Sequence, residues 1–415
     1  MPNNWKTYKL GDLIKIKHGY AFKGEFFSDE ANQNVLLTPG NFNSFGGIKF
    51  NWDKQKFYNG EIPEDYLLNK GDLIIALTDL TQSCSILGST AIIKDSNYNY
   101  LHNQRLGLVK DINENVDSNF LYYVFNNSAF RNHLISTKTG STVSHTAPER
   151  IYNFEIQIPK NLQEQKSIAQ ILSTIDDKIE NNLAINKTLE EMAMALYKHW
   201  FVDFGPFQNG EFVDSELGSI PKGWEVKKLV DFVKLTMGQS PKSEFYNLDN
   251  EGLPFHQGVT NYGERFPEDK TYSTEGNRFA EEGDILFSVR APVGRLNIAK
   301  NKIILGRGLS SMSLKKYTNN GFLFYSLKNF FTEDDKIGEG TVYGSVNKTE
   351  LENLKFIVPC NETLENFNDL VKDIDSKYLN NYKENQTLTQ LRDTLLPKLI
   401  SGEVRLKEFR EAITN

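Results

Sequence analysis

The chain has 415 residues, of which 39% are hydrophobic and 12% aromatic, and a formal net charge of −7. This length exceeds what one hydrophobic core usually organises, so we expect two or three domains. No apolar run approaches the roughly 18 residues that span a membrane, and residues 1–12 lack the pattern of a signal peptide, which favours a cytoplasmic protein. The two cysteines, Cys84 and Cys360, are far apart and lie near no pair of closely spaced histidines, so we expect no disulfide and no metal site.

The first predicted module, residues 1–160, has 16 basic and 16 acidic side chains, so it is neutral overall. Short β-branched or apolar runs bounded by Gly, Asn and Asp predict strands. The expected strands are 72–77, 90–94, 106–110 and 154–158, and one helix is expected at about 118–134. We therefore predict a mixed α/β domain.

Loops of this module contain polar and charged side chains that can bind a ligand through paired hydrogen bonds, and nucleic-acid bases are one such ligand. Arg pairs with guanine, and Asn or Gln with adenine, through two hydrogen bonds each, whereas Lys, Ser and Thr more often contact phosphates. The candidates are Thr78, Asp79, Gln82, Ser83, Asn103, Gln104, Arg105, Ser144 and His145. For each of them an ordinary role at the surface or in a turn is the alternative.

In residues 161–200, apolar side chains recur with the seven-residue repeat of a coiled-coil helix. With Ile168 at heptad position a, the next a positions are Ile175, Asn182, Leu189 and Leu196. We predict a helix from about 163 to 199, roughly 54 Å long. An asparagine in an apolar seam costs stability and fixes the register of the paired helices.

A linker is expected at 201–223, and the segment 161–221 holds 4 basic and 10 acidic side chains. The aromatic residues Trp200, Phe201, Phe204 and Phe207 lie where this helix ends. They fit two interpretations, a cap that closes the helix onto the next module or a docking surface for a partner protein. We favour the cap, and keep Trp200, Phe201 and Phe204 as candidates for partner binding.

The second module, 224–360, repeats the first. The pattern Trp5-x-x-x-Lys9-Leu10-x-Asp12 returns as Trp224-x-x-x-Lys228-Leu229-x-Asp231, and a Gly-Asp strand, a helix (321–331) and a strand ending in proline return in the same order. The offset between matched positions falls from 219 to 200, so the frame is shared while the connecting loops diverge. That combination suits two domains that read different targets.

Candidates for base reading in the second module come from its loops, and residues 222–359 hold 19 basic and 18 acidic side chains. They are Gln257, Asn261, Tyr262, Arg290, Arg295 and Arg307. We expect Arg105 and Arg307 to be equivalent positions of the repeat, at an offset of 202.

A second helix is predicted in 361–402, from about 363 to 399, before a tail at 403–415. At an offset of 199 it again places an asparagine, Asn381, at the third a position. If the two helices pack antiparallel, Asn182 meets Asn381 on a pseudo-two-fold axis. The predicted fold class is thus α+β, with two mixed α/β domains separated by two long antiparallel coiled-coil helices.

Motifs of catalysis are missing from the sequence. It has no G-x-x-x-x-G-K-[ST] loop, no N-P-P-Y or D-P-P-Y motif for amino-methyl transfer and no G-x-S-x-G nucleophile turn. We therefore expect a chain without catalytic residues or a cofactor of its own.

This duplicated order resembles the specificity (S) subunit of type I restriction-modification systems, over essentially the whole chain. Residues 199–204 (HWFVDF) look like the segment after that family's central helix, 395–405 (LLPKLISGEVR) like its usual C-terminal ending, and 283–290 (GDILFSVR) like a strand of its target-recognition domains. The resemblance implies that one domain reads each half of a bipartite site in double-stranded DNA, and that the helices set the unread spacer.

The resemblance further implies two modification (methyltransferase) subunits as partners, joined by restriction (translocase-nuclease) subunits for cleavage, and no membrane. S-adenosylmethionine, ATP and Mg would then serve those partner subunits and not this chain. A two-headed scaffold that binds proteins or carbohydrate stays open as an alternative, because its aromatic content also suits sugar binding. A nuclease or methyltransferase acting alone would need a metal or cofactor motif.

Overall fold

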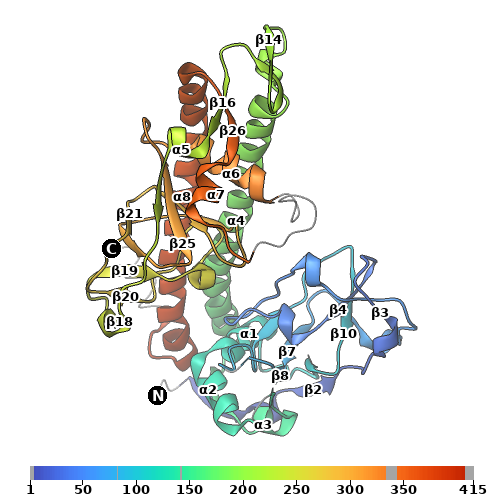
Figure 1. The fold of residues 1–415 in the computed structure, drawn as a ribbon. Coiled ribbons are helices and arrows are strands. Elements are labelled where there is room, and N and C mark those ends of the chain that lie inside the picture. The colour runs from blue at the N-terminus through green and yellow to red at the C-terminus, as the bar shows by residue number, and fades with distance from the viewer. Residues whose placement is uncertain (1–3, 82, 141–142, 333–343, 407–415) are drawn as a thin grey trace. The chain divides into compact units, whose positions relative to one another are not determined.

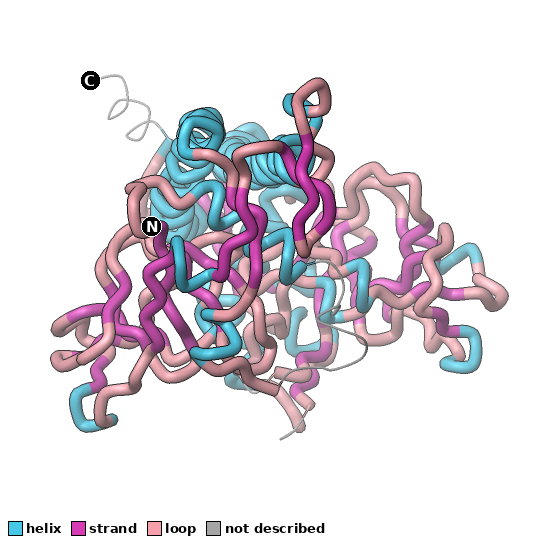
Figure 2. Tube along the Cα trace, turned by 45° about the horizontal axis from the view of Figure 1, so that its top comes forward, coloured by secondary structure: helices cyan, strands magenta, loops and turns pink. Residues whose placement is uncertain are grey.

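The computed structural model describes residues 4–81, 83–140, 143–332 and 344–406. The chain divides into two compact units: unit 1 is made of residues 1–181 and 384–415, and unit 2 of residues 182–383. Strands and loops make up most of each unit outside the two long helices (Figure 2). Each unit therefore combines one α/β domain with one half of each long helix.

Unit 1 contains two sheets. The four-stranded antiparallel sheet has the order β2-β11-β7-β9 and the five-stranded sheet the order β3-β5-β4-β10-β6, in which β4 and β10 are parallel. The strands of the first sheet are β2 (Lys15–His18), β7 (Leu73–Ala76), β9 (Thr90–Ile92) and β11 (Leu106–Lys110). Those of the second are β3 (Phe27–Ser28), β4 (Asn34–Leu37), β5 (Phe57–Tyr58), β6 (Leu67–Leu68) and β10 (Asn99–His102). The strands expected at 72–77, 90–94 and 106–110 are thus confirmed.

Two strand pairs and three helices complete this domain. Strand β1 (Trp5–Lys9) pairs with β13 (Glu155–Pro159), and β8 (Thr78–Asp79) pairs with β12 (Ser144–His145). The helices are α1 (Ser118–Asn126), α2 (Ser128–Thr137) and α3 (Pro148–Tyr152), and short 3-10 helices lie at Leu10–Asp12, Gly24–Phe26, Pro39–Asn41, Trp52–Lys54 and Glu64–Tyr66. The single helix predicted at 118–134 is broken at Asn127, whose backbone is extended and whose side chain caps α2 by accepting the Ala129 N–H.

Unit 2 has the same strand orders, β17-β25-β22-β23 and β18-β20-β19-β24-β21. The first sheet contains β17 (Val233–Met237), β22 (Ile285–Ser288), β23 (Leu296–Ile298) and β25 (Leu309–Leu314). The second contains β18 (Tyr246–Asn247), β19 (Leu253–His256), β20 (Tyr272–Ser273), β21 (Phe279–Ala280) and β24 (Ile303–Leu305). Because each strand has a counterpart in unit 1, the predicted internal repeat is confirmed.

Most of the remaining elements of unit 2 also have counterparts in unit 1. They are β16 (Glu225–Lys228) paired with β26 (Lys355–Val358), the helices α5 (Leu229–Phe232), α6 (Gly321–Thr332) and α7 (Lys348–Glu352), and 3-10 helices at Gly205–Phe207, Ser243–Phe245 and Val259–Asn261. The hairpin of β14 (Phe212–Ser215) and β15 (Gly218–Pro221) lies in the linker that follows the first long helix.

The long helices are α4 (Leu162–Phe201, 40 residues) and α8 (Asn361–Ser401, 41 residues), green and red in Figure 1. They are antiparallel within each unit. In unit 1, Arg392 pairs with Asp176 at 3.1 Å, and Asn385 Nδ2 donates to the carbonyl of Ile179 at 3.3 Å. In unit 2, Asn381 Nδ2 donates to Asn186 Oδ1 at 2.9 Å.

The two asparagines predicted to fix the register, Asn182 and Asn381, are 0% and 2% exposed. They are therefore buried, as expected for residues that lie between the two helices. The bond described for Asn381 is nevertheless made to Asn186, one helical turn beyond Asn182. Asn186 Nδ2 in turn donates to the carbonyl of Tyr378 at 3.3 Å. A direct contact between Asn182 and Asn381 stays a prediction.

Both long helices contribute to the core of each unit. The main core of unit 1 includes Ile168 and Leu172 of α4 and Leu395 and Leu399 of α8. The main core of unit 2 includes Tyr197 and Phe201 of α4 and Leu364, Phe367 and Val371 of α8. Burying these apolar side chains is the dominant stabilising term for such contacts. None of the helices in the described ranges is long and apolar enough to cross a membrane.

Candidate nucleic-acid interface

In unit 1 a tight turn joins β10 to β11. The N–H of Leu106 donates to the carbonyl of Asn103 at 2.9 Å, and this bond closes the turn with Gln104 and Arg105 at its tip. Both tip side chains are exposed, whereas Asn103 is buried and accepts the Arg105 N–H through Oδ1 at 3.0 Å. Two of the predicted candidates therefore face solvent on a rigid turn.

A neighbouring loop holds this turn through backbone bonds. Tyr20 N–H donates to the carbonyl of His102 at 2.8 Å, and Gln104 N–H donates to the carbonyl of Tyr20 at 3.0 Å. A Cβ atom on Gly19 would lie 2.1 Å from the carbonyl oxygen of Asn103, so only glycine permits this close approach. Lys23, four residues after that glycine, is exposed.

Two further segments lie against the other side of the turn. Leu77 N–H donates to the carbonyl of Arg105 at 3.0 Å, and Thr146 N–H donates to the carbonyl of Leu77 at 2.9 Å. The Thr78 hydroxyl is 3.1 Å from Nδ1 of His145, whose side chain is exposed. We call residues 19–23, 77–79, 103–106 and 144–146 edge 1.

Asp79, a residue of edge 1, stabilises the loop that follows it. Its side chain is fully buried, and its carboxylate accepts the N–H groups of Thr81, Ile86 and Leu87 at 2.6 to 3.0 Å. Arg131 of α2 binds the same loop through its guanidinium, which donates to the backbone carbonyls of Ser85 and Leu87. The guanidinium also donates to the carbonyl of Ser44, and all three distances are 2.6 to 2.7 Å. Sequence reasoning placed Asp79 among the base contacts, but its carboxylate is already occupied in shaping the loop.

The remaining candidates of the first domain lie on or beneath this loop. Ser83 is exposed, and Gln82 lies outside the described residues. Ser144 is buried, with its hydroxyl 3.1 Å from Cys84 Sγ and 2.9 Å from Lys138 Nζ. The exposed set in unit 1 is thus Ser83, Gln104, Arg105 and His145.

Unit 2 has a corresponding edge. Leu309 N–H donates to the carbonyl of Gly306 at 3.0 Å, which closes a turn between β24 and β25 with Arg307 and Gly308 at its tip. Arg307 is exposed, and its N–H donates to Ser240 Oγ at 3.2 Å. A Cβ atom on Gly238 would lie 2.1 Å from the Gly306 carbonyl oxygen, the same close approach as at Gly19.

Two more of the predicted candidates lie beside this second turn. Gly308 N–H donates to the carbonyl of Gln257 at 3.0 Å, and the Ser240 hydroxyl donates to Gln257 Oε1 at 2.8 Å. Val289 N–H donates to the carbonyl of Gly308 at 2.9 Å, which brings the exposed Arg290 to the same place. Val346 N–H donates to the carbonyl of Val289 at 2.9 Å, so residues 344–346 lie beside this segment. We call residues 238–242, 256–258, 289–291, 306–309 and 344–346 edge 2.

The predicted equivalence of Arg105 and Arg307 is wrong by one residue. His102 pairs with Leu37 in β10 and β4, and Leu305 pairs with His256 in β24 and β19, so the structural offset here is 203. The turns that follow close at the same step, Asn103 to Leu106 and Gly306 to Leu309. Gln104 is therefore the counterpart of Arg307, and matching the two identical arginines shifted the alignment.

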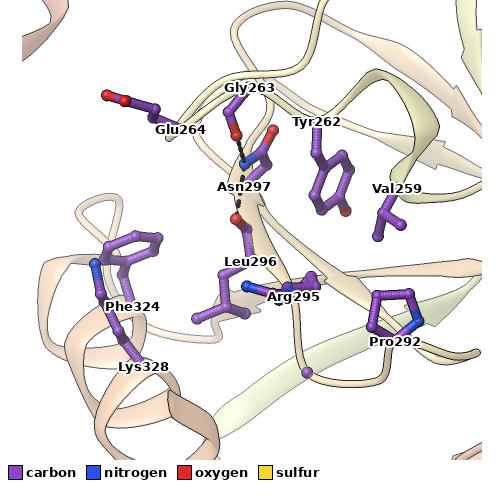
Figure 3. Close-up of a pocket in the computed structure, with 11 residues that line it drawn as sticks. Val259, Tyr262, Gly263, Glu264, Pro292, Arg295, Leu296, Asn297, Phe324 and Lys328 are labelled. Carbon is purple, nitrogen blue, oxygen red and sulfur yellow. Dashed lines mark hydrogen bonds between the residues drawn. The ribbon is translucent and has the colours of Figure 1, made fainter. Parts of the chain in front are cut away.

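Tyr262 and Arg295 belong to a different feature, a pocket of about 390 Å³ in unit 2 (Figure 3). Asn297 Nδ2 donates to the carbonyls of Gly263 and Leu296 on its wall. The Tyr262 hydroxyl is buried without a hydrogen-bond partner among the described residues, and this burial raises its pKa. Asn261 precedes Tyr262 at the end of a 3-10 helix and is half-buried.

The three aromatic candidates for partner binding pack within unit 2. Phe201 is 4% exposed, and its ring centroid lies 4.8 Å from that of Phe367 and 5.7 Å from that of Trp224. Trp200 and Phe204 are half-buried against the same group. These contacts support the cap and leave Phe201 no free face for a partner.

Sequence reasoning missed the glycine-lysine pair of each edge. Gly19-x-x-x-Lys23-x-Glu25-Phe26 returns as Gly238-x-x-x-Lys242-x-Glu244-Phe245 at an offset of 219. Extending the repeat search by a few residues beyond Asp12 would have found this signal. No sequence pattern indicated the role of Arg131, because its contacts with loop carbonyls are seen only in the folded structure.

The exposed candidates of both edges are chemically alike. In the described ranges no group of three or more His, Cys, Asp or Glu side chains could hold a metal ion. The exposed candidates instead combine amide, imidazole and guanidinium groups, which suit hydrogen bonding to base edges and to phosphates. The duplicated geometry therefore fits binding to a polyanion with two similar halves.

Comparison with known proteins identifies the family. The family model described as type I restriction modification DNA specificity domain matches residues 2–191 and again residues 221–395. The chain belongs to this family. The resemblance seen in the sequence is confirmed, and the family assignment supports a type I specificity subunit with two target-recognition domains, not the two-headed protein or carbohydrate scaffold.

Two specificity subunits of known sequence are similar to this chain over almost its whole length. It is 32% identical to the type I restriction enzyme MjaIX specificity subunit of Methanocaldococcus jannaschii, with 99% of this chain and 95% of the relative covered. It is 29% identical to the putative MjaX specificity subunit of the same organism, over 98% and 95%. The crystal structure of the type I S subunit from M. genitalium shares the fold with a TM-score of 0.58 at 17% identity, covering 96% of this chain and 97% of that one.

Proposed function

We propose that this specificity subunit reads a bipartite DNA target with one half-site per domain, through edge 1 and edge 2. The observation that carries the proposal is the duplicated turn, which presents exposed polar side chains from the same place in two matching sheets. Because the exposed residues differ between the edges, the two half-sites are expected to differ in sequence. The proposed contacts are Ser83, Gln104, Arg105 and His145 in edge 1 and its adjoining loop, and Gln257, Arg290 and Arg307 in edge 2.

The chain is proposed to be the non-catalytic member of a cytoplasmic complex. Two modification subunits would methylate DNA, and restriction subunits would translocate and cleave it, with S-adenosylmethionine, ATP and Mg bound by those partners. The support is the family assignment, since the matching relatives are described as specificity subunits of type I restriction enzymes. Hydrolysis or methylation of DNA by the pure chain would contradict this part of the proposal.

The experiment is to express the chain with its modification subunits and map methylated bases across the host genome. We expect one bipartite motif with a fixed spacer. Replacing residues 1–150 with those of a related specificity subunit should change one half of that motif and leave the other half unchanged. A change in both halves would contradict the assignment of one domain to each half-site.

Binding by the isolated chain is expected to be weak and strongly dependent on salt, because most of the affinity then comes from phosphate contacts. Addition of the modification subunits should produce tight, sequence-specific binding. A salt-resistant complex between the isolated chain and DNA of any sequence would count against this model.

A further inference from the structure

We infer that Gln104 and Arg307 are the corresponding base-reading residues of the two domains, with Gln104 reading an adenine in one half-site and Arg307 a guanine in the other. This inference rests on the proposed function, since it assigns a role within the same edges. It also replaces the pairing of Arg105 with Arg307 that sequence matching suggested.

The first step is the structural equivalence of the two positions. Each is the residue directly after the one whose carbonyl closes the turn, Asn103 in unit 1 and Gly306 in unit 2. The strands that leave the turns have matching registers, because Leu106 pairs with Ala76 and Leu309 pairs with Ser288. Both positions therefore start from the same backbone geometry.

The second step is that an equivalent glycine packs against both turns. Gly19 N–H donates to the carbonyl of Leu106 at 3.2 Å, and Gly238 N–H donates to that of Leu309 at 2.9 Å. A methyl group on either glycine would strike the turn at 2.1 Å. A turn fixed in this way holds the backbone of its tip residue, so each side chain projects from a defined place.

The third step is that both side chains are available. Gln104 and Arg307 are exposed, and within the described ranges neither side chain has a hydrogen-bond or ion-pair partner. Arg131 of unit 1 and Arg265 of unit 2 differ in this respect, because their guanidinium groups are buried and already bonded within their own units. The two turn residues are thus free to bind a ligand.

The fourth step is the chemistry of the two side chains. A glutamine amide offers one donor and one acceptor, which match N7 and N6 of adenine, and a guanidinium offers two donors, which match O6 and N7 of guanine. Edge 1 and edge 2 thus carry two different base-reading groups at one shared position. Two domains that read different half-sites need different side chains at the same place in a shared fold.

Some residues are identical in the two edges, unlike Gln104 and Arg307. Lys23 and Lys242 are equivalent, exposed and of the same type, and the glycines before them are equivalent as well. A feature common to both domains cannot distinguish the half-sites, so it suits the phosphate backbone, which they share. Arg105 has Gly308 as its counterpart, so it is not part of a shared reading position.

The test uses the complete complex with its modification subunits and three variants, Arg307→Gln, Arg307→Lys and Lys242→Gln. Binding is measured for a set of duplexes in which each base of the target is changed in turn, at several salt concentrations. The Arg307→Gln variant should bind the original target about 5- to 150-fold more weakly, the range expected for one bidentate base contact. It should lose discrimination at one guanine of one half-site only.

The Arg307→Lys variant keeps the charge but lacks the planar pair of donors, so it should discriminate at that guanine less sharply than the unchanged complex does. The Lys242→Gln variant should instead weaken binding to all duplexes equally and lower the salt slope by about 0.9. In unit 1, Gln104→Ala should relax the requirement for one adenine in the other half-site.

Two results would overturn the inference. Arg307→Gln could behave as Lys242→Gln does, with a uniform loss and a smaller salt slope, which would make Arg307 a phosphate contact. Alternatively, it could bind every duplex as the unchanged complex does, which would place Arg307 outside the interface. Failure of the unchanged complex to prefer any sequence would contradict the proposed function itself, so the two failures are distinguishable.

Discussion

The Tyr123 hydroxyl donates a hydrogen bond to Asp176 Oδ2 at 2.8 Å and thereby ties α1 of unit 1 to α4. The other oxygen of this carboxylate accepts a bond from Arg392 of α8 at 3.1 Å. Unit 2 repeats the tyrosine-aspartate bond, since Tyr325 donates to Asp375 at 3.3 Å. There the arginine that pairs with the carboxylate is Arg265, which lies in a loop of the domain and not on a long helix. In each unit a tyrosine of the domain is thus bonded to an aspartate of a long helix.

Replacing Tyr123 with phenylalanine should lower the free energy of unfolding by about 1 to 2 kcal/mol, because Asp176 loses one charge-assisted partner and keeps the other. Tyr122→Phe is the matched control on the same helix, since the Tyr122 hydroxyl has no hydrogen-bond partner among the described residues. Chemical denaturation of the full chain measures both. Equal losses for the two variants would show that the bond to Asp176 contributes nothing.

A pH effect is expected from His102, which is fully buried between the sheets of unit 1. Burial lowers its pKa from 6.5 to about 4, although the hydrogen bond to the carbonyl of Leu106 opposes this shift. In the unfolded chain the imidazole takes up a proton near pH 6.5, while in the folded chain it stays neutral down to about pH 4. The stabilising contribution is therefore complete above pH 6.5 and is lost as the pH falls from 6.5 to 4.

The structural counterpart of His102 in unit 2 is Leu305, which suggests the variant His102→Leu. Thermal unfolding of the unchanged chain at pH 7 and pH 5 should show a loss of stability at the lower pH, with an upper limit of about 3 kcal/mol over the whole window. The variant should lose less between the same two pH values. An unchanged pH dependence would mean that other groups cause it.

The close approach at Gly19 predicts a strong effect of one methyl group. Gly19→Ala should destabilise unit 1 by about 1 to 3 kcal/mol, because the new Cβ atom must displace the carbonyl of Asn103. Gly24→Ala is the control in the same loop, since a Cβ atom at Gly24 meets nothing within 4 Å, and its effect should stay within about 0.5 kcal/mol. If Gly19→Ala were as mild as the control, the turn would be more adaptable than the reading of bases requires.

Arg131 is predicted to matter for stability, unlike the arginines of the two edges. Arg131→Met leaves three loop carbonyls without their donor and should lower the free energy of unfolding by about 3 kcal/mol. Arg105→Met changes an exposed side chain and should alter it by no more than about 0.5 kcal/mol. Denaturation curves of the two variants provide the comparison, and similar midpoints would contradict the role assigned to Arg131.

Sequence patterns predicted the repeat, the long helices and three strands of the first sheet, because these features depend on the spacing of apolar residues. They did not predict the break at Asn127, where a polar side chain caps a new helix inside an apolar run. They also did not show that the Asp79 carboxylate accepts N–H groups of its own loop, since an aspartate in a loop looks the same whether it binds a ligand or the backbone.

The error at Arg105 and Arg307 has a different physical origin. Two identical side chains were matched, whereas the fold conserves the hydrogen bonds of the turn, and these are made by backbone atoms that the sequence does not display. Only the strand registers, His102 with Leu37 and Leu305 with His256, show which positions correspond. Base-reading residues are the hardest to align for this reason, since they are the ones that differ between domains.

The sharing of α8 between the units has a consequence for shortened versions of the chain. Leu395, Leu396 and Leu399 are part of the main core of unit 1, although more than 200 residues separate them from the sheets they cover. A stop codon near position 384 should therefore make the first domain prone to proteolysis while leaving the second largely protected. Supplying residues 384–415 as a separate peptide should restore that protection.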